Sequence, residues 1–369
     1  MKPEHRRILY IVLICTVCVL ALVFGLVFWL RKKDEEVPNT DKEEKDEEID
    51  VLNSYNNTKE LIKKYPVINN TTVLPGLEEK IQNRLLTGFE NWNRGFKTWK
   101  AWGNILYTND SIYNFHGARL SLAHYQAAMD ISLKQAKILM GDFHNMLITD
   151  DFTAIHYDFI TEKEGSRTVG KVMEFVKFKD YGNELGTRVV EGWGSTKDNS
   201  YYGLIQFQKE EKEEQERQDN YNLNYVIPEK EDLKEKYPIK YKTSYIDENS
   251  NDILKIILEG FDSWNKGISY YIDFVEKNYH ENATSSSLDE RERTMEQYKN
   301  EIKELFDKEF IEKLYFDNIL IRENWAALHY RYRKEDKSNK EKSVGDRMQF
   351  LKFEQNEDGN LMISASWIQ

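Results

Sequence analysis

Two segments of the chain place apolar residues every three or four positions, which is the spacing of one face of an α-helix. The first stripe consists of Leu77, Ile81, Leu85, Phe89 and Trp92, and the second of Ile253, Ile257, Phe261 and Trp264. Each stripe is followed by an Asn, a basic residue and a Gly, and glycine favours the left-handed backbone that ends a helix. The pattern predicts one long buried helix in each half of the chain.

The similarity between the two segments continues along the chain, which indicates an internal duplication. Four pairs of matching segments occur in the same order: Leu61–Val67 with Leu233–Ile239, Gly88–Gly95 with Gly260–Gly267, Ala154–Tyr157 with Ala327–Tyr330, and Met173–Phe178 with Met348–Phe353. The spacing between the members of each pair hardly changes. We therefore expect two tandem copies of one folded unit.

After the helices the hydrophobic period changes to two, the period of half-buried β-strands. The first copy has four such runs, Met146–Ile148, Ala154–Ile160, Val172–Phe178 and Thr187–Trp193. The second has Ile319–Ile321, Trp325–Tyr332, Met348–Phe353 and Leu361–Trp367. Helices followed by an antiparallel meander define an α+β fold. We expect two tandem cone-shaped domains, in which a curved antiparallel sheet wraps a long helix and leaves a cavity open at one end.

This order resembles a known family. A helix ending in Phe89-x-x-Trp92-Asn93-x-Gly95 is followed by Tyr107–Tyr113, a helix and four strands that finish near Trp193. The arrangement is similar to the nuclear transport factor 2-like (NTF2-like) superfamily, in its SnoaL-like branch, over residues 77–195 and more weakly over 250–369. The superfamily includes ketosteroid isomerase, scytalone dehydratase and polyketide cyclases together with non-catalytic binding and assembly domains. The resemblance therefore implies a fold without deciding a function.

The N-terminal region predicts a membrane anchor. The uncharged run Ile8–Leu30 is long enough to cross a hydrocarbon core of about 30 Å as a helix. A cleavable signal peptide is the rival interpretation, but its apolar region is shorter and ends in small residues, whereas this run leads directly into Arg31. Basic residues flank both ends, so the positive-inside rule gives nearly a tie. The short N-terminal tail favours a single-pass protein of the cell membrane with extracytoplasmic domains.

These observations divide the chain into five segments. They are a tail and transmembrane anchor (1–33, with the span at 8–30), an acidic tether (34–54), a first NTF2-like domain (55–205), a charged linker (206–226) and a second NTF2-like domain (227–369). The tether is rich in Asp and Glu, so it repels itself and anionic lipid. We expect it to hold the domains away from the bilayer.

Charge and cysteine content exclude some classes of function. The chain has 52 Lys and Arg against 64 Asp and Glu, for a net charge of -12, so we expect no nucleic-acid partner. Its only cysteines, Cys15 and Cys18, lie in the predicted span, which excludes a disulfide framework or a cysteine nucleophile elsewhere. Phosphate-loop and metal-binding motifs are absent from the sequence, so we expect neither cofactor nor metal.

The candidate catalytic groups are histidines and a tyrosine. His156 and His329 occupy equivalent strand positions on the face opposite Tyr157, and if that face lines the cone, either imidazole is a candidate general acid or base. A structural histidine is the alternative. Tyr113 and His116 exist only in the first copy, at the predicted cavity mouth. The position nearest the isomerase's base is Asn114 or Phe115 rather than a carboxylate, so no catalytic residue carries over from the resemblance.

Aromatic residues are the candidate pocket lining. Besides Tyr157 and His329, the candidates are Trp92, Trp99, Trp102, Tyr107 and Phe115, which would suit a small apolar ligand or simply form the core. Three hypotheses follow. The first is a membrane-anchored, non-enzymatic module that binds a ligand, a partner protein or a second copy of the chain. The second is a SnoaL-like lyase, isomerase or cyclase acting on a small apolar carbonyl substrate. The third is a VirB8-like scaffold subunit of an envelope or conjugation complex.

Overall fold

The structure is a computed structural model, and it describes residues 58–115, 118–182, 186–196, 209–241, 250–286 and 291–369. The chain divides into a unit of residues 1–50 and a unit of residues 51–369, and every described residue belongs to the second. The predicted anchor at 8–30 and the tether at 34–54 lie outside the described residues. Within the described ranges, no helix is long and apolar enough to cross a membrane.

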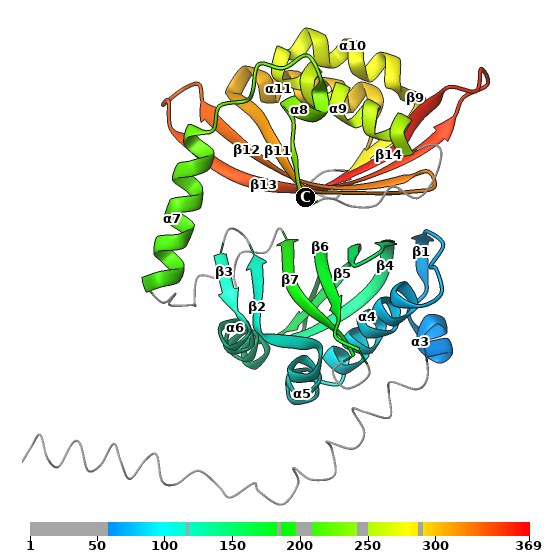
Figure 1. The fold of residues 1–369 in the computed structure, drawn as a ribbon, viewed down its shortest axis with the longest axis vertical. Coiled ribbons are helices and arrows are strands. Elements are labelled where there is room, and N and C mark those ends of the chain that lie inside the picture. Colours follow the sequence, from blue (N-terminus) through cyan, green and yellow to red (C-terminus); the bar gives the residue numbers. More distant parts are fainter. Residues whose placement is uncertain (1–57, 116–117, 183–185, 197–208, 242–249, 287–290) are drawn as a thin grey trace, which may run out of the picture. The chain divides into compact units, whose positions relative to one another are not determined.

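The first half of the described chain, residues 58–196, forms helices and one seven-stranded sheet (Figure 1). Its elements follow in the order α3 (Thr58–Lys64), β1 (Val67–Asn70), α4 (Leu77–Asn93), α5 (Phe96–Leu106), β2 (Tyr107–Phe115), β3 (Ala118–Ser121), α6 (Leu122–Gln135), β4 (Lys137–Thr149), β5 (Phe152–Lys163), β6 (Ser166–Asp180) and β7 (Thr187–Thr196). Helices α4, α5 and α6 cover one face of the curved sheet, called here its inner face.

The second half, residues 233–369, has the same kinds of element in the same order. They are α8 (Leu233–Lys236), β8 (Ile239–Tyr241), α9 (Ser250–Lys266), α10 (Ile268–Asn278), β9 (Tyr279–Ser286), β10 (Glu292–Thr294), α11 (Met295–Lys308), β11 (Glu309–Arg322), β12 (Trp325–Asp336), β13 (Lys342–Gln355) and β14 (Leu361–Ile368). Helix α7 (Lys209–Asn224) lies between the halves in the sequence. The chain therefore has an α+β fold with two sheets, each packed with helices.

The two sheets have the same strand order. The first runs β1-β4-β5-β6-β7-β2-β3 and the second β8-β11-β12-β13-β14-β9-β10. Both contain a central antiparallel meander, as the alternating pattern predicts. Each also has two parallel pairings, β1 with β4 and β7 with β2 in the first sheet, and β8 with β11 and β14 with β9 in the second. The sheets are thus mixed rather than purely antiparallel.

The predicted helical stripes form the centre of each half. Phe89 of α4 packs on Phe143 of β4 with ring centroids 4.1 Å apart, and Phe261 of α9 packs on Phe316 of β11 at 4.0 Å. The helices also approach their neighbours closely at glycine. A Cβ atom on Gly88 would lie 2.4 Å from the ring of Trp102, so only glycine lets α5 pack this closely against α4.

The outer faces of the two sheets, which the helices leave uncovered, pack on one another in a single apolar cluster. Its buried members come in equivalent pairs from the two halves: Leu147 and Leu320, Phe152 and Trp325, Ala154 and Ala327, Met173 and Met348, and Phe175 and Phe350. Trp193 is also buried there, and its equivalent Trp367 packs against the cluster. The contact has approximate twofold symmetry, because each half contributes the same patch of its outer face.

A buried ion pair also joins the halves. Arg322 at the end of β11 donates to both carboxylate oxygens of Glu78 in α4, at 2.5 and 2.7 Å, and to the carbonyl of Thr72 at 2.6 Å. The Arg322 and Glu78 side chains are only 4% and 5% exposed. Glu78 also accepts bonds from the backbone amides of Leu74 and Asp150, so its two oxygens are well satisfied.

Helix α7 lies within the segment 206–226, which the sequence predicts to be a charged linker. It packs against β12 and β13 of the second sheet. Its C-terminal end is held by Arg333 of β12, which donates to the carbonyls of Leu223 and Tyr225. Asn222 of α7 accepts a 2.7 Å bond from the hydroxyl of Tyr315 in β11. These contacts explain how a segment with almost no apolar stripe forms an ordered helix.

Candidate functional site

The first hollow is the cavity between the helices and the inner face of the first sheet. Three predicted pocket residues, Trp92, Phe115 and Tyr157, line it. Its volume is only about 30 Å³, which is room for about two water molecules. Trp92 is fixed there because its indole nitrogen donates to the carbonyl of Ile138 at 3.0 Å. Aromatic side chains therefore fill most of the predicted cone.

Glu174 of β6 supplies a carboxylate to the first hollow. It accepts a 2.8 Å hydrogen bond from the hydroxyl of Tyr157. Burial raises the pKa of Glu174 above its usual 4.5, and the hydroxyls of Tyr113 and Tyr157 oppose part of that rise. Chemically, this pair is a partly buried carboxyl group able to hold or release a proton beside a phenol.

The second hollow is the corresponding cavity of the second half, with a volume of about 40 Å³. It contains Lys313 of β11, which is only 8% exposed. The Lys313 amine lies 4.6 Å from the ring centre of Phe261 and 4.5 Å from that of Trp264, and it also faces Tyr271 and Tyr330. Burial, helped by the charge of Arg347, lowers the pKa of Lys313 from 10.5 to about 7.

His156 and His329 lie on the outer faces of the sheets, between the halves, and not in either hollow. His156 is 2% exposed, bonds Asn145 at 3.0 Å and stacks near Phe350. His329 is fully buried and packs near Phe175. The hypothesis that this strand face lines the cone is therefore wrong, because the face is covered by the other half. Burial, with the charges of His144 and Lys171, lowers the pKa of His156 well below 6.5.

The other predicted site residues are core residues, or lie outside the residues that the structure describes. Trp99 packs edge-on against Trp92 at 5.0 Å, and Trp102 is buried beside α4. Tyr107 packs near Tyr125. Tyr113 is 3% exposed and stacks on Tyr125 at 4.3 Å, so it is part of the core rather than the rim of an opening. His116 lies outside the described residues.

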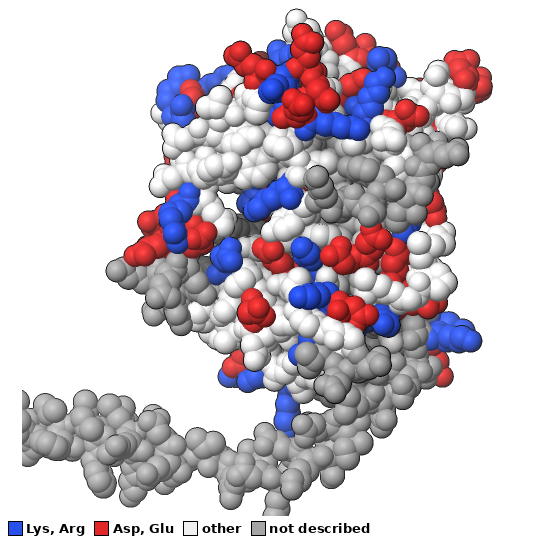
Figure 2. All heavy atoms as spheres, in the orientation of Figure 1, with Lys and Arg blue, Asp and Glu red and all other residues white. Residues whose placement is uncertain are grey.

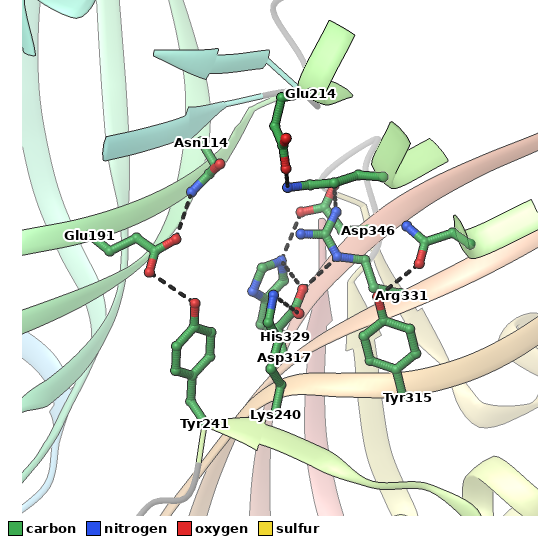
Figure 3. A network of polar contacts seen from close by, with 12 residues as sticks. Asn114, Glu191, Glu214, Lys240, Tyr241, Tyr315, Asp317, His329, Arg331 and Asp346 are labelled. Atoms are coloured by element: carbon green, nitrogen blue, oxygen red, sulfur yellow. Dashed lines mark hydrogen bonds and ion pairs between the residues drawn. The ribbon is translucent and has the colours of Figure 1, made fainter. Parts of the chain in front are cut away.

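A polar network extends from His329 toward the surface (Figure 3). His329 bonds Asp346 at 2.8 Å, and Arg331 donates to the buried Asp317 at 2.5 Å. On the side of the first half, Glu191 accepts a 2.9 Å bond from the hydroxyl of Tyr241. One carboxylate oxygen of Asp317 has no hydrogen-bond partner in the described part of the chain; the amine of Lys240 lies 3.9 Å from it.

This network borders a surface groove of about 460 Å³. The groove is formed by α7, β8, β11 and β12 and is lined by Glu214, Arg217, Gln218, Tyr221, Asn222, Tyr225, Pro238, Lys240, Tyr315, Asp317 and Arg331. Three of its tyrosines contact one another, with ring centres 5.1 to 6.5 Å apart. Figure 2 shows acidic and basic side chains interspersed on the face it draws. The groove therefore combines aromatic surface with charges of both signs.

Sequence reasoning missed Glu174, Lys313, Arg347 and the groove. The first three differ between the halves: Glu174 corresponds to Gln349, Lys313 to Met140, and Arg347 to Val172. A search for residues that the copies share passes over such positions. A position-by-position comparison of the copies for changes of charge is the signal that would have found them.

Comparison with known proteins gives only distant similarities. No protein-family profile and no curated protein matches the chain. Among solved structures it is similar to a ketosteroid isomerase-like protein from Erwinia carotovora atroseptica, at 8% identity over 33% of this chain and 96% of that one, with a TM-score of 0.28. ActVI-ORFA from Streptomyces coelicolor gives 10% identity over 32% and 94%, with a TM-score of 0.27. A candidate SnoaL-like polyketide cyclase from Jannaschia gives 13% over 34% and 91%, at 0.28. Similarities this distant carry no argument about the chemistry of this chain.

Proposed function

We propose that this chain is a membrane-anchored pair of duplicated NTF2-like domains that binds a partner outside the cytoplasm and catalyses no reaction. The observation that carries the proposal is the size of the two hollows, about 30 and 40 Å³. Sites for drug-sized small molecules usually measure about 300–1,000 Å³. A polyketide-sized substrate does not fit in either hollow.

The groove beside α7 is the binding surface in this proposal. At about 460 Å³ it has the volume of a ligand site, and it presents Tyr221 with 59% of its surface exposed. Lys240, Asp317 and Arg331 bring charge to the groove wall, and the tyrosine rings suit a planar or apolar group. The occupant that fits is a polypeptide segment that offers polar backbone groups beside an aromatic or aliphatic side chain.

A photo-crosslinking amino acid at position 221 tests this proposal in intact cells. We expect a discrete adduct with one partner from position 221. Tyr270 on α10 is a matched control, because it is 57% exposed and lies outside the groove. The Asp317→Asn substitution should weaken the adduct from position 221. Equal labelling from positions 221 and 270, or none from either, contradicts the groove as the binding surface.

The anchor is tested separately. In the proposal, residues 8–30 span the bilayer and the domains lie outside the cytoplasm. Protease added to intact cells with a permeable outer layer should digest the domains, while a cytoplasmic control protein stays whole. Removal of residues 1–33 should release the chain from the membrane fraction. Protection of the domains in intact cells would reverse the proposed orientation.

The second candidate function is acid–base catalysis in the first hollow. It is favoured by one observation, the partly buried Glu174 carboxyl group that accepts a hydrogen bond from Tyr157. In that case a small carbonyl compound should exchange its α-protons for deuterium in the presence of the protein, and Glu174→Gln should abolish the exchange. The second half already carries Gln349 at the equivalent position, so this substitution suits the fold. Exchange that is equal with and without the protein excludes this candidate.

A further inference from the structure

The two hollows differ in the sign of their charge. The first is lined by Glu174, and the described residues that line it include no Lys or Arg. The second is lined by Lys313 and Arg347, and none of its described lining residues is Asp or Glu. Three aligned positions account for the whole difference in charge. The first half has Met140, Val172 and Glu174 where the second has Lys313, Arg347 and Gln349.

Both cations of the second hollow lack a counter-charge. No hydrogen bond or ion pair joins the Lys313 amine to another described residue, and its closest contacts are aromatic rings at 4.5 to 5.6 Å. Arg347 lies over the ring of Tyr332 at 5.2 Å, likewise without an ion pair among the described residues. The buried Lys313 and the partly buried Arg347 place two like charges around one cavity, and their repulsion is relieved when the amine loses its proton or when an opposite charge enters.

Neutral polar side chains also line the cavity. Tyr330 and Gln349 line the hollow together with the two cations. Tyr271 and Tyr298 share a 2.9 Å hydrogen bond at its wall. The amide nitrogen of Gln349 donates to the hydroxyl of Ser366 at 2.9 Å, which fixes this residue. The cavity volume of about 40 Å³ admits one group of only two or three heavy atoms besides hydrogen.

We propose that the second hollow binds a small monovalent anion, a carboxylate or a halide, between Lys313 and Arg347. The inference goes beyond the proposed function, because it assigns a ligand to the second hollow and does not depend on the groove. The anion supplies the missing counter-charge, and the surrounding rings exclude water, which strengthens the attraction. The lowered pKa of Lys313 agrees with an amine that has no anion beside it, and a bound anion would raise it.

Thermal unfolding of the full chain tests the inference, with formate or chloride added at constant ionic strength set by gluconate, which is too large for the cavity. Binding to the folded state raises the unfolding temperature in a saturable way. We expect saturation with at least one of the two small anions. A larger effect of formate assigns the site to carboxylates, whereas a larger effect of chloride assigns it to halides.

Two substitutions taken from the first half remove the site while preserving packing. Lys313→Met introduces the residue found at position 140, and Arg347→Val the residue found at position 172. Each should weaken anion binding at least tenfold, which is about 1.4 kcal/mol. Lys255→Met is the matched control, since this lysine is 72% exposed on α9, and it should bind as the unmodified chain does. Circular dichroism checks that each variant folds. If only one of the two variants folds, that variant is enough for the test.

The inference is overturned if no small anion gives a saturable shift, or if both folded variants bind formate and chloride as tightly as the unmodified chain. It fails separately from the proposed function. Loss of the anion effect with an intact adduct from position 221 refutes the anion site alone. A saturable anion effect without any adduct refutes the groove alone.

Discussion

Replacement of Glu78 by glutamine should cost this protein about 3–5 kcal/mol of stability, because it leaves the Arg322 guanidinium buried without a counter-charge. The guanidinium is 4% exposed and makes two of its three described bonds to Glu78, at 2.5 and 2.7 Å. A glutamine side chain of the same shape accepts only one of these bonds, since its nitrogen is a donor facing another donor.

The reverse substitution, Arg322→Met, should cost about 3 kcal/mol, toward the lower end of the same range. Glu78 then keeps its two backbone donors, the amide of Leu74 at 2.8 Å and that of Asp150 at 3.1 Å. The double variant contains neither charge and should lose little more than one single variant does. The coupling energy from the cycle is therefore about 3 kcal/mol.

Urea unfolding of the full chain, followed by tryptophan fluorescence, measures each free energy from the midpoint and slope. Asp130→Asn is a control, because Asp130 pairs with Lys134 at 2.6 Å on the exposed surface of α6 and should contribute less than about 0.5 kcal/mol. The reasoning is refuted if Glu78→Gln changes stability no more than this control does. It is also refuted if the two single effects simply add in the double variant.

Three further predictions concern packing and pH. Gly88→Ala should destabilise the chain by about 1–3 kcal/mol in urea unfolding, because its Cβ would meet Trp102 at 2.4 Å, whereas Gly103→Ala, with its nearest neighbour at 3.4 Å, should be tolerated. His156→Gln should lose less stability than the unmodified chain between pH 7 and pH 5. The folded pKa of His156 lies well below the unfolded value of 6.5. Between pH 7 and pH 5 the unfolded chain therefore binds a proton at His156 that the folded chain does not, which lowers the free energy of unfolding. An equal loss of stability in both proteins contradicts this prediction. Glu174→Gln should gain stability relative to the unmodified chain as pH rises above about 4.5, because burial raises the folded pKa of Glu174; parallel pH profiles would contradict it.

The helices and the strand meander could be predicted from the sequence because they have one buried stripe or face with a clear period. Ile81 and Phe89 on α4, and their counterparts on α9, are buried as the spacing predicts. The strands outside the meander were missed for the opposite reason. Strand β8 has only three residues, and β2 contains the polar run Thr108–Ser111, so neither shows an apolar alternation.

The site was harder to predict because both faces of the meander are buried. Tyr157 faces the first hollow and His156 faces the other half, and the two positions are equally inaccessible, at 2% exposure each. Alternation alone separates the two faces of a strand without showing which of them borders a cavity. Exposure is also decided by contacts between residues far apart in sequence, such as His156 with Phe350.

The pairing of the two sheet faces is intramolecular, which changes how it responds to dilution. Two separate copies joined through such a surface would come apart when the protein is scarce, whereas here each patch is always tethered to its mate by the same polypeptide. The pairing needs no second molecule and leaves the matching patch unavailable to one. Self-association that keeps this internal pairing intact must therefore use a different surface. A substitution in one hollow also leaves the other hollow unchanged, because the two halves are different segments of one chain.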